Sequence, residues 1–292
     1  MDYMRWALEL AREALGVSSP NPPVGAVVVR DGQIVGEGHT LPPGQAHAEI
    51  VALRQAADQA RGATIYTTLE PCCHFGRTPP CTREIIQAGV AEVHAALIDP
   101  NPLVNGMGMA ELEAAGIKTH LGECEAEARE IAEGYIKLMT TGLPFVVAKF
   151  AMSLDGKIAT ASGESRWITS EEARRYAAEL RRQSDAVMVG IGTALADDPR
   201  LTARDGKGNP LERQPLRIVV DSSARLSTSA QIFKEPGPVL VATAGALEAE
   251  TQALRSAGAK VVSLPAEDGT VDLGALLCAL GEQEVTSVLV EG

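Results

Sequence analysis

Hydrophobic and polar residues alternate with two different periods along the first half of the chain, a pattern that predicts alternating helices and strands. Apolar side chains recur at helical spacing over residues 2–15, as in an amphipathic helix. The apolar runs 24–29 and 33–38 flank Asp31-Gly32, a pair typical of a two-residue type I′ hairpin turn. The same criteria predict helices that start near His47, pass through 85–86, lie near 110–115 and run from about 123 to 139, with strands at 63–69, 92–98 and 117–121.

The second half shows a further alternation of apolar runs and helical periods. Residues 140–144 form a natural boundary, because glycine and proline interrupt regular structure there. Residues 145–150 then read as a new, fully apolar strand. The predicted fold class is therefore α/β with two domains, 1–143 and 144–292. Further strands are expected at 186–189, 216–220, 239–242, 260–263 and 287–290, and helices at 171–182, 247–257 and 273–280.

Composition and charge narrow the class of protein. The chain has 292 residues, 45% of them hydrophobic and 22% charged, which is ordinary for globular domains. No segment approaches the apolar run of about 20 residues that a membrane span needs. The start lacks a signal-peptide pattern, and the five cysteines fit a reducing interior. We therefore expect a cytoplasmic protein without a membrane partner. The net charge of −12 also argues against nucleic-acid binding.

The strongest chemical signal is His47-Ala48-Glu49 followed by Pro71-Cys72 and Cys81. One imidazole and two thiolates are zinc ligands, and three protein ligands leave the open position that distinguishes catalytic from structural zinc. Zinc lowers the pKa of a water in that position. Glu49, which is not a ligand in this scheme, can carry the proton to the substrate. The pattern predicts a zinc deaminase, since H-x-E…P-C-x-x-C is the signature of such enzymes.

The second cysteine departs from that signature, because eight residues separate Cys72 from Cys81. Cys73 and His74 lie in this insertion and are alternative ligands. Adjacent side chains diverge, so Cys72 and Cys73 cannot easily bind one ion together, and we select Cys72. A structural zinc site or buried core cysteines would be the plain alternative. Cys124 and Cys278 are interpreted as ordinary cysteines.

The second half has no G-x-G-x-x-G fingerprint, because Gly190-Ile191-Gly192 lacks the third glycine. A nicotinamide site cannot be inferred from that motif. Three other segments stand out by their composition: Ser-Leu-Asp-Gly-Lys at 153–157, Gly-Glu-Ser-Arg-Trp-Ile-Thr at 163–169, and 192–201 with its Asp-Asp-Pro turn.

These motifs together resemble the RibD family of riboflavin-biosynthesis proteins, in which a pyrimidine deaminase is joined to a 5-amino-6-(5-phosphoribosylamino)uracil reductase. The resemblance covers essentially the whole chain. It rests on Ser-Pro-Asn-Pro-Pro-Val-Gly at 19–25, on His47-Ala48-Glu49, on 70–81 with its long loop between the cysteines, and on the three segments of the second half.

The resemblance implies a cytidine-deaminase-like first domain and a dihydrofolate-reductase-like second domain that uses NADPH. It implies zinc bound by His47, Cys72 and Cys81, with Glu49 as proton donor. In the first domain it implies that Asn21 and Arg77 bind the phosphorylated pyrimidine. In the second domain it implies dinucleotide contacts at Ala151, Trp167, Thr193, Asp197 and Ser222, and substrate contacts at Ser165, Arg181, Leu201, Arg204 and Glu291.

Residue type alone favours plainer interpretations of several of these positions. Trp167 would be half-buried core, Arg181 a solvated helix residue, and Asp197 part of a simple turn. The alternatives for the whole chain are a deaminase with a degenerate second domain, a different nucleobase deaminase, and a non-catalytic zinc-stabilised binding protein. The chain is further expected to form a homo-oligomer.

The chain ends at Glu291-Gly292, where the family continues with more glycines and further elements. We therefore expect a C-terminally truncated reductase domain. In this expectation, one face of the sheet lacks part of its cover beside the last strand. NADPH binding would be weak or absent because a glycine-rich phosphate loop is missing.

Overall fold

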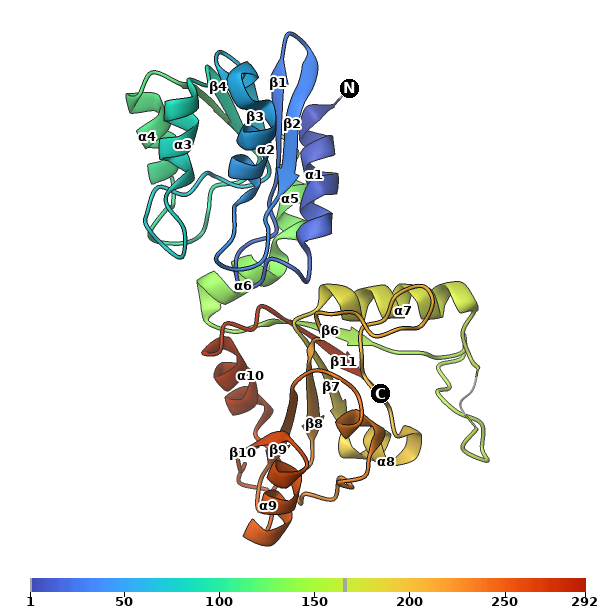
Figure 1. The fold of residues 1–292 in the computed structure, drawn as a ribbon. Helices are drawn as coiled ribbons and strands as arrows, with labels where there is room; N and C mark the ends of the chain where they lie inside the picture. The colour runs from blue at the N-terminus through green and yellow to red at the C-terminus, as the bar shows by residue number, and fades with distance from the viewer. Residues whose placement is uncertain (1, 165–166) are drawn as a thin grey trace. The chain divides into compact units, whose positions relative to one another are not determined.

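A computed structural model describes residues 2–164 and 167–292 (Figure 1). The chain divides into two compact units, one that ends at Gly142 and one that begins at Leu143. Each has its own sheet and its own hydrophobic core, as the predicted two-domain α/β class requires. Among the described residues, no helix is long and apolar enough to cross a membrane.

The first unit is built on a five-stranded sheet of order β2-β1-β3-β4-β5. β1 pairs antiparallel with both β2 and β3, whereas β3, β4 and β5 are parallel. Asp31 and Gly32 both have positive φ, 51° and 77°, so the predicted type I′ turn is confirmed. The strands are β1 (Gly25–Arg30), β2 (Gln33–His39), β3 (Thr64–Thr67), β4 (Glu92–Ala95) and β5 (Lys118–Leu121).

Helices cover both faces of this sheet. They are α1 (Tyr3–Ala14), α2 (Ala48–Ala56), the short 3-10 helix η1 (Ala57–Ala60), α3 (Cys81–Ala88), α4 (Met107–Ala114), α5 (Glu125–Ile131) and α6 (Glu133–Thr141).

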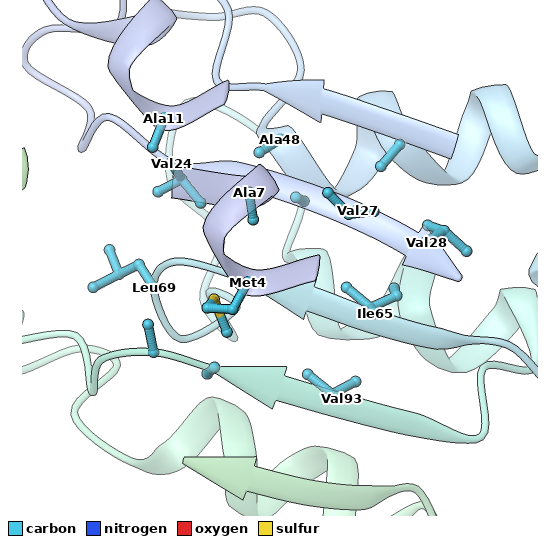
Figure 2. Packing of buried hydrophobic residues seen from close by; sticks show 14 of the residues in the cluster. Met4, Ala7, Ala11, Val24, Val27, Val28, Ala48, Ile65, Leu69 and Val93 are labelled. Atoms are coloured by element: carbon cyan, nitrogen blue, oxygen red, sulfur yellow. The ribbon is translucent and has the colours of Figure 1, made fainter. Parts of the chain in front are cut away.

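Two glycines set how closely the helices approach the sheet. A Cβ on Gly25 would lie 1.9 Å from the carbonyl oxygen of Ala7 in α1, and a Cβ on Gly36 would lie 2.1 Å from that of Ala52 in α2. α1 and α2 therefore pack almost directly on the strand backbone, on opposite faces because the two glycines point opposite ways. Figure 2 shows α1 packed over the sheet through Met4, Ala7 and Ala11.

The second unit is built on a six-stranded parallel sheet of order β10-β9-β8-β7-β11-β6. Alternate residues of its strands enter two separate cores, one on each face. The strands are β6 (Phe145–Lys149), β7 (Ala186–Gly190), β8 (Leu216–Val220), β9 (Val239–Thr243), β10 (Ala259–Ser263) and β11 (Ser287–Glu291). The helices are α7 (Glu171–Gln183), α8 (Ile191–Asp197), η2 (Gln231–Phe233), α9 (Glu248–Ser256) and α10 (Leu273–Gly281).

Two local expectations are corrected, one is borne out, and one element was not foreseen. The helix predicted over 123–139 is interrupted at Ala132 and forms α5 and α6. The expected fully apolar strand at 145–150 is β6, at the edge of the sheet, where half-buried and exposed residues alternate. Val288 and Leu289 of β11 are fully buried on opposite faces, whereas Val146 of β6, the register partner of Val288, is 40% exposed, so one face does lack cover beside the last strand, as expected. The short helix α8 was not predicted.

Candidate functional site

The start of α2 places the first two candidate residues. His47 is the N-cap of α2, in an extended conformation with ψ 163°, and Glu49 lies in the first helical turn. This confirms the prediction that the pair sits at a helix start rather than inside a helix. The backbone is extended at His47 and helical at Glu49. In a regular helix, residues two apart point in nearly opposite directions, and this change of conformation removes that constraint. Glu49 is buried, with 4% of its surface exposed.

The two cysteines reach His47 from separate elements. Cys72 lies in the segment after β3, and Cys81 is the first residue of α3, directly after Pro80. The Sγ atoms of Cys72 and Cys81 lie 3.6 and 3.3 Å from Nδ1 of His47. One ligand atom from each of these three residues falls within 4.8 Å of the other two. The structure thus brings together the three predicted zinc ligands.

Burial and hydrogen bonding shift the pKa values of the groups in this cluster. Burial raises the pKa of Glu49 to about 7, although the nearby His47 acts to lower it. A carboxyl group that titrates near neutrality can both accept and donate a proton. Hydrogen bonding to Cys72 raises the pKa of His47. The hydrogen bond with Cys81 lowers the pKa of Cys72, which favours the thiolate form that binds metal.

The alternative ligands in the inserted loop have other surroundings. Cys73 directs its Sγ to the carbonyl oxygen of Leu103 at 3.6 Å. His74 has a buried Nδ1 without a hydrogen-bond partner. Among the described residues, the candidate metal-binding group around His47 includes Cys72 but neither Cys73 nor His74.

Glu70 anchors the cysteine segment and was missed by sequence reasoning. Its carboxylate accepts four backbone N–H groups: Oε2 from Asp99 and Gly106 at 3.1 and 2.8 Å, and Oε1 from Gly108 and Met109 at 2.9 and 3.2 Å. Glu70 is 3% exposed. These bonds fix the backbone two residues before Cys72. An acidic residue directly before a Pro-Cys pair was the available signal.

A pocket of about 520 Å³ opens beside His47 and is lined by Arg77, Arg54 and Thr78 among others. The hydroxyl of Thr78 lies 3.2 Å from Nε2 of His47, so this pocket reaches the metal-ligating cluster. Asn21, the other predicted substrate residue, has a buried side-chain Nδ2 without a hydrogen-bond partner. Such a donor is costly unless a ligand or water satisfies it.

In the second unit, four of the five predicted dinucleotide residues lie in segments that follow the carboxyl ends of parallel strands. Ala151 follows β6, Thr193 and Asp197 belong to α8 directly after β7, and Ser222 follows β8. Open α/β sheets bind ligands outside this edge. A Cβ at Gly292 would lie 2.8 Å from Oγ1 of Thr193, so the end of β11 meets the same region.

An ion-pair network lies at that edge and joins two predicted substrate residues. Glu291, 7% exposed at the end of β11, binds Nζ of Lys149 at 3.1 Å and Nη2 of Arg181 at 2.9 Å. Burial acts to raise the pKa of Glu291, but Arg181 and Lys149 outweigh it and lower the pKa. Arg181 is therefore paired within the protein, which corrects its interpretation as a merely solvated helix residue.

The remaining predicted residues lie in different surroundings. Arg204 pairs with Glu235 at 2.9 Å and donates to the carbonyl of Gly208 at 2.6 Å, so its guanidinium is held by the protein. Leu201 is 1% exposed and packs in the core, which leaves only its backbone for a ligand. Trp167 is 72% exposed under the guanidinium of Arg174, so half-buried core is wrong for it. Ser165 lies outside the described residues.

Comparison with known proteins agrees with both units. Residues 1–97 match the cytidine and deoxycytidylate deaminase zinc-binding region, and residues 144–292 match the RibD C-terminal domain. Riboflavin biosynthesis protein RibD of Aquifex aeolicus is 45% identical over all of this chain and 80% of its own length. That of Escherichia coli is 44% identical over 99% of this chain and 80% of its own length.

Solved structures agree as well. RibD of Acinetobacter baumannii, form 1, superposes with a TM-score of 0.88 and 43% identity over 99% of this chain and 79% of that one. A diaminohydroxyphosphoribosylaminopyrimidine deaminase/5-amino-6-(5-phosphoribosylamino)uracil reductase from Thermotoga maritima superposes with a TM-score of 0.86 and 38% identity over 99% of this chain and 80% of that one. The chain belongs to the RibD family of riboflavin-biosynthesis proteins, with a zinc-type deaminase domain followed by a reductase domain.

Proposed function

We propose that this chain catalyses two successive steps of riboflavin biosynthesis. The first unit hydrolytically deaminates 2,5-diamino-6-(5-phosphoribosylamino)pyrimidin-4(3H)-one, and the second reduces the ribosyl side chain of the product to ribityl. The convergence of His47, Cys72 and Cys81 beside the buried Glu49 carries this proposal. The Thermotoga relative, whose name contains both activities, supports the substrate assignment.

The donor set of the cluster fits a zinc ion. An imidazole nitrogen and two cysteine sulfurs are typical zinc ligands, and three protein ligands leave one coordination position for the reaction. In this proposal His47, Cys72 and Cys81 hold the ion. When bound, zinc supplies a Lewis acid that makes water nucleophilic near neutral pH.

Glu49 moves the protons of the deamination. Its buried carboxyl group is close enough to Cys81 to interact with that thiol, so it lies beside the three ligands without being one of them. It accepts one proton from the attacking water and passes it to the ring nitrogen, and then carries the remaining hydroxyl proton to the amine, so that the carbonyl forms as the C–N bond breaks and ammonia leaves.

Asn21 and Arg77 bind the pyrimidine and its phosphate in this proposal. The unpartnered Nδ2 of Asn21 and the position of Arg77 on the wall of the pocket beside His47 support it. A small phosphorylated substrate needs only a few local donors, so it is compatible with a net charge of −12, which argues against extensive contact with nucleic acid. Cytoplasmic location and homo-oligomer formation stay predictions.

The second unit takes its hydride from a pyridine nucleotide, which we propose is NADPH. Ala151, Thr193, Asp197 and Ser222 lie near the carboxyl edge of the sheet, which supports a dinucleotide site there. When bound, the cofactor supplies the hydride. Trp167 offers an exposed aromatic face to the same ligand.

Arg181, Arg204 and Glu291 orient the sugar phosphate in the second step. Glu291 holds Arg181 in place, so a phosphate that approaches this edge meets a guanidinium of fixed orientation. Arg204 would exchange part of its contact with Glu235 for the substrate. Leu201 can contribute backbone contacts alone, and Ser165 remains a proposed contact from the resemblance.

A product analysis separates the alternatives. The protein is incubated with the diaminopyrimidinone phosphate, with and without NADPH, and the products are identified by mass. We expect the deaminated compound without NADPH and the ribityl compound with it. Deamination alone in both samples would make the chain a deaminase without reductase activity. An unchanged substrate would contradict the proposed deaminase.

Replacing Glu49 with Gln tests the mechanism of the first step. Glu49→Gln keeps the three ligand side chains but removes the group that carries the proton, so we expect bound zinc near the wild-type level and ammonia release lowered at least about 100-fold. Zinc content and ammonia release measure the two effects. Glu9→Gln, on the exposed face of α1, is the matched control and should behave as wild type. Wild-type ammonia release in Glu49→Gln would show that another group moves the proton.

A further inference from the structure

A second group of metal-ligating side chains lies on the sheet of the first unit, apart from the deaminase cluster. His94 of β4 and His120 of β5 are direct partners in the strand register, and Glu92 precedes His94 by two residues on the same face. Oε1 of Glu92 lies 3.1 Å from Nε2 of His94 and 2.7 Å from Nε2 of His120. One ligand atom of each residue lies within 4.8 Å of the other two.

Glu123 orients one of the imidazoles. Its Oε2 lies 3.3 Å from Nδ1 of His94. If Nδ1 carries the hydrogen of this contact, Nε2 of a neutral ring directs its lone pair at the carboxylate of Glu92. Nε2 of His94 and Oε1 of Glu92 then both direct lone pairs into the space between them, which a proton or a metal cation must occupy. A carboxylate on the far nitrogen of a histidine ligand is the usual outer partner in metal sites.

The surroundings hold this arrangement in place but leave it open to ions. The rings of Tyr66, His94 and His120 are stacked across three strands, with centroids 4.5 and 4.4 Å apart. His94 is 19% exposed and His120 is 51% exposed at the side chain, so an ion can enter from solvent. Lys118, opposite Glu92 in the ladder, is itself exposed, so its ammonium can remain in water.

We infer that Glu92, His94 and His120 form a second divalent-metal site, with Glu123 as a positioning residue. Two imidazoles and one carboxylate suit Zn²⁺ and neighbouring transition-metal ions rather than Mg²⁺ or Ca²⁺. The ion would join β4 to the edge strand β5 through three protein ligands, and water would complete its coordination. The site contains no thiolate, which distinguishes it chemically from the deaminase cluster.

Metal titration of the zinc-loaded protein tests this inference. Protein with one zinc per chain is titrated with Zn²⁺ by calorimetry, and we expect a second equivalent to bind. A parallel titration with Co²⁺ should give weak visible bands for the second equivalent without thiolate-to-metal charge transfer, because its ligands are nitrogen and oxygen.

Four variants assign the second equivalent. His120→Ala and Glu92→Gln should each weaken its binding at least tenfold, and Glu123→Gln should weaken it by about 10- to 100-fold, as loss of an outer partner does. His39→Ala is the matched control. His39 also faces a carboxylate, Glu13 at 3.5 Å, but belongs to no such group among the described residues. The His39→Ala variant should bind both equivalents of zinc. The His120→Ala variant should retain the wild-type deaminase rate.

Two results would overturn the inference. One is a wild-type protein that binds no second equivalent at millimolar Zn²⁺. The other is a second equivalent that binds unchanged to both His120→Ala and Glu92→Gln, which would place it elsewhere. Far-UV circular dichroism of each variant shows whether the fold is retained, and the Co²⁺ spectrum of the wild type decides the ligand type without any variant.

Discussion

Neighbouring residues of the cysteine segment have different surroundings, in a stretch of backbone without regular secondary structure. The Sγ atom of Cys72 lies beside Nδ1 of His47, whereas that of Cys73 contacts the carbonyl oxygen of Leu103. Glu70 holds this backbone through four N–H groups. The position of a zinc-ligand candidate thus depends on a carboxylate that lies outside the group formed by His47, Cys72 and Cys81.

Glu291 provides a residue-scale prediction for the pH dependence of stability. Its pKa is lowered in the folded protein by Arg181 and Lys149, despite burial. The stabilisation is therefore fully present above the ordinary value of 4.5 and is lost as pH falls through the lower folded-state pKa. Glu291→Gln should lower the free energy of unfolding of the second unit by about 1.5–3 kcal/mol at pH 7. The difference should shrink as the pH falls below 4.5, measured by denaturant unfolding at several pH values.

Glu248→Gln is the matched control for this prediction. Glu248 pairs with Arg255 at 2.9 Å, but its side chain is 82% exposed, so the pair contributes little. Its replacement should change the free energy of unfolding by less than about 1 kcal/mol at either pH. An effect of Glu291→Gln that stays constant from pH 7 to strong acid would contradict an ionic origin.

At the scale of elements, the contact of α2 with β2 positions the candidate catalytic machinery of the first unit. α2 carries His47 and Glu49 at its start, and Gly36 lets its backbone lie on β2. A helix displaced from the strand would move both side chains away from Cys81. The glycine therefore acts on the site without touching it.

Gly36→Ala tests this contact. The new Cβ would lie 2.1 Å from the carbonyl oxygen of Ala52, so backbone must move. We expect a loss of about 1–3 kcal/mol in the free energy of unfolding, as in overpacked cores, and a lower deaminase rate at saturating substrate. Gly206→Ala, where a Cβ meets nothing within 4 Å, is the control and should be neutral. Wild-type stability of Gly36→Ala would show that α2 can shift freely.

Elements with strong local sequence signals were predictable. Features that depend on the surrounding tertiary structure were not. The hairpin around Asp31-Gly32 and the N-terminal helix follow from turn chemistry and periodicity alone. α8 escaped prediction because a helix of seven residues that includes a glycine has a weak pattern. The partial exposure of β6 could not be foreseen, since an apolar sequence does not say whether a strand is central or at an edge.

At the scale of the whole molecule, the chain combines two units that each bury a core. Removing zinc should therefore destabilise the first unit alone. Ions that bind only the native state add about 2.7 kcal/mol at 100 times their dissociation constant, and a chelator removes this contribution.

Two tryptophans make this prediction measurable by fluorescence. Trp6 lies in the first unit and Trp167 in the second. In Trp167→Phe, the chelator should lower the unfolding midpoint reported by Trp6, and added zinc should restore it. In Trp6→Phe, the midpoint reported by Trp167 should not change. Equal shifts in both variants would mean that the two units unfold as one.

The sequence by itself determined the chemistry of the deaminase half and most secondary structure. His47, Glu49, Cys72 and Cys81 are recognisable because zinc catalysis restricts which residue types can occur at short spacing, and helices and strands follow local periodicity. Only the tertiary structure decided which distant residues meet. Strand order brings Lys149 to Glu291, 142 residues away, and strand register pairs His94 with His120. Such contacts depend on how sheets assemble from separate segments, which no local pattern records.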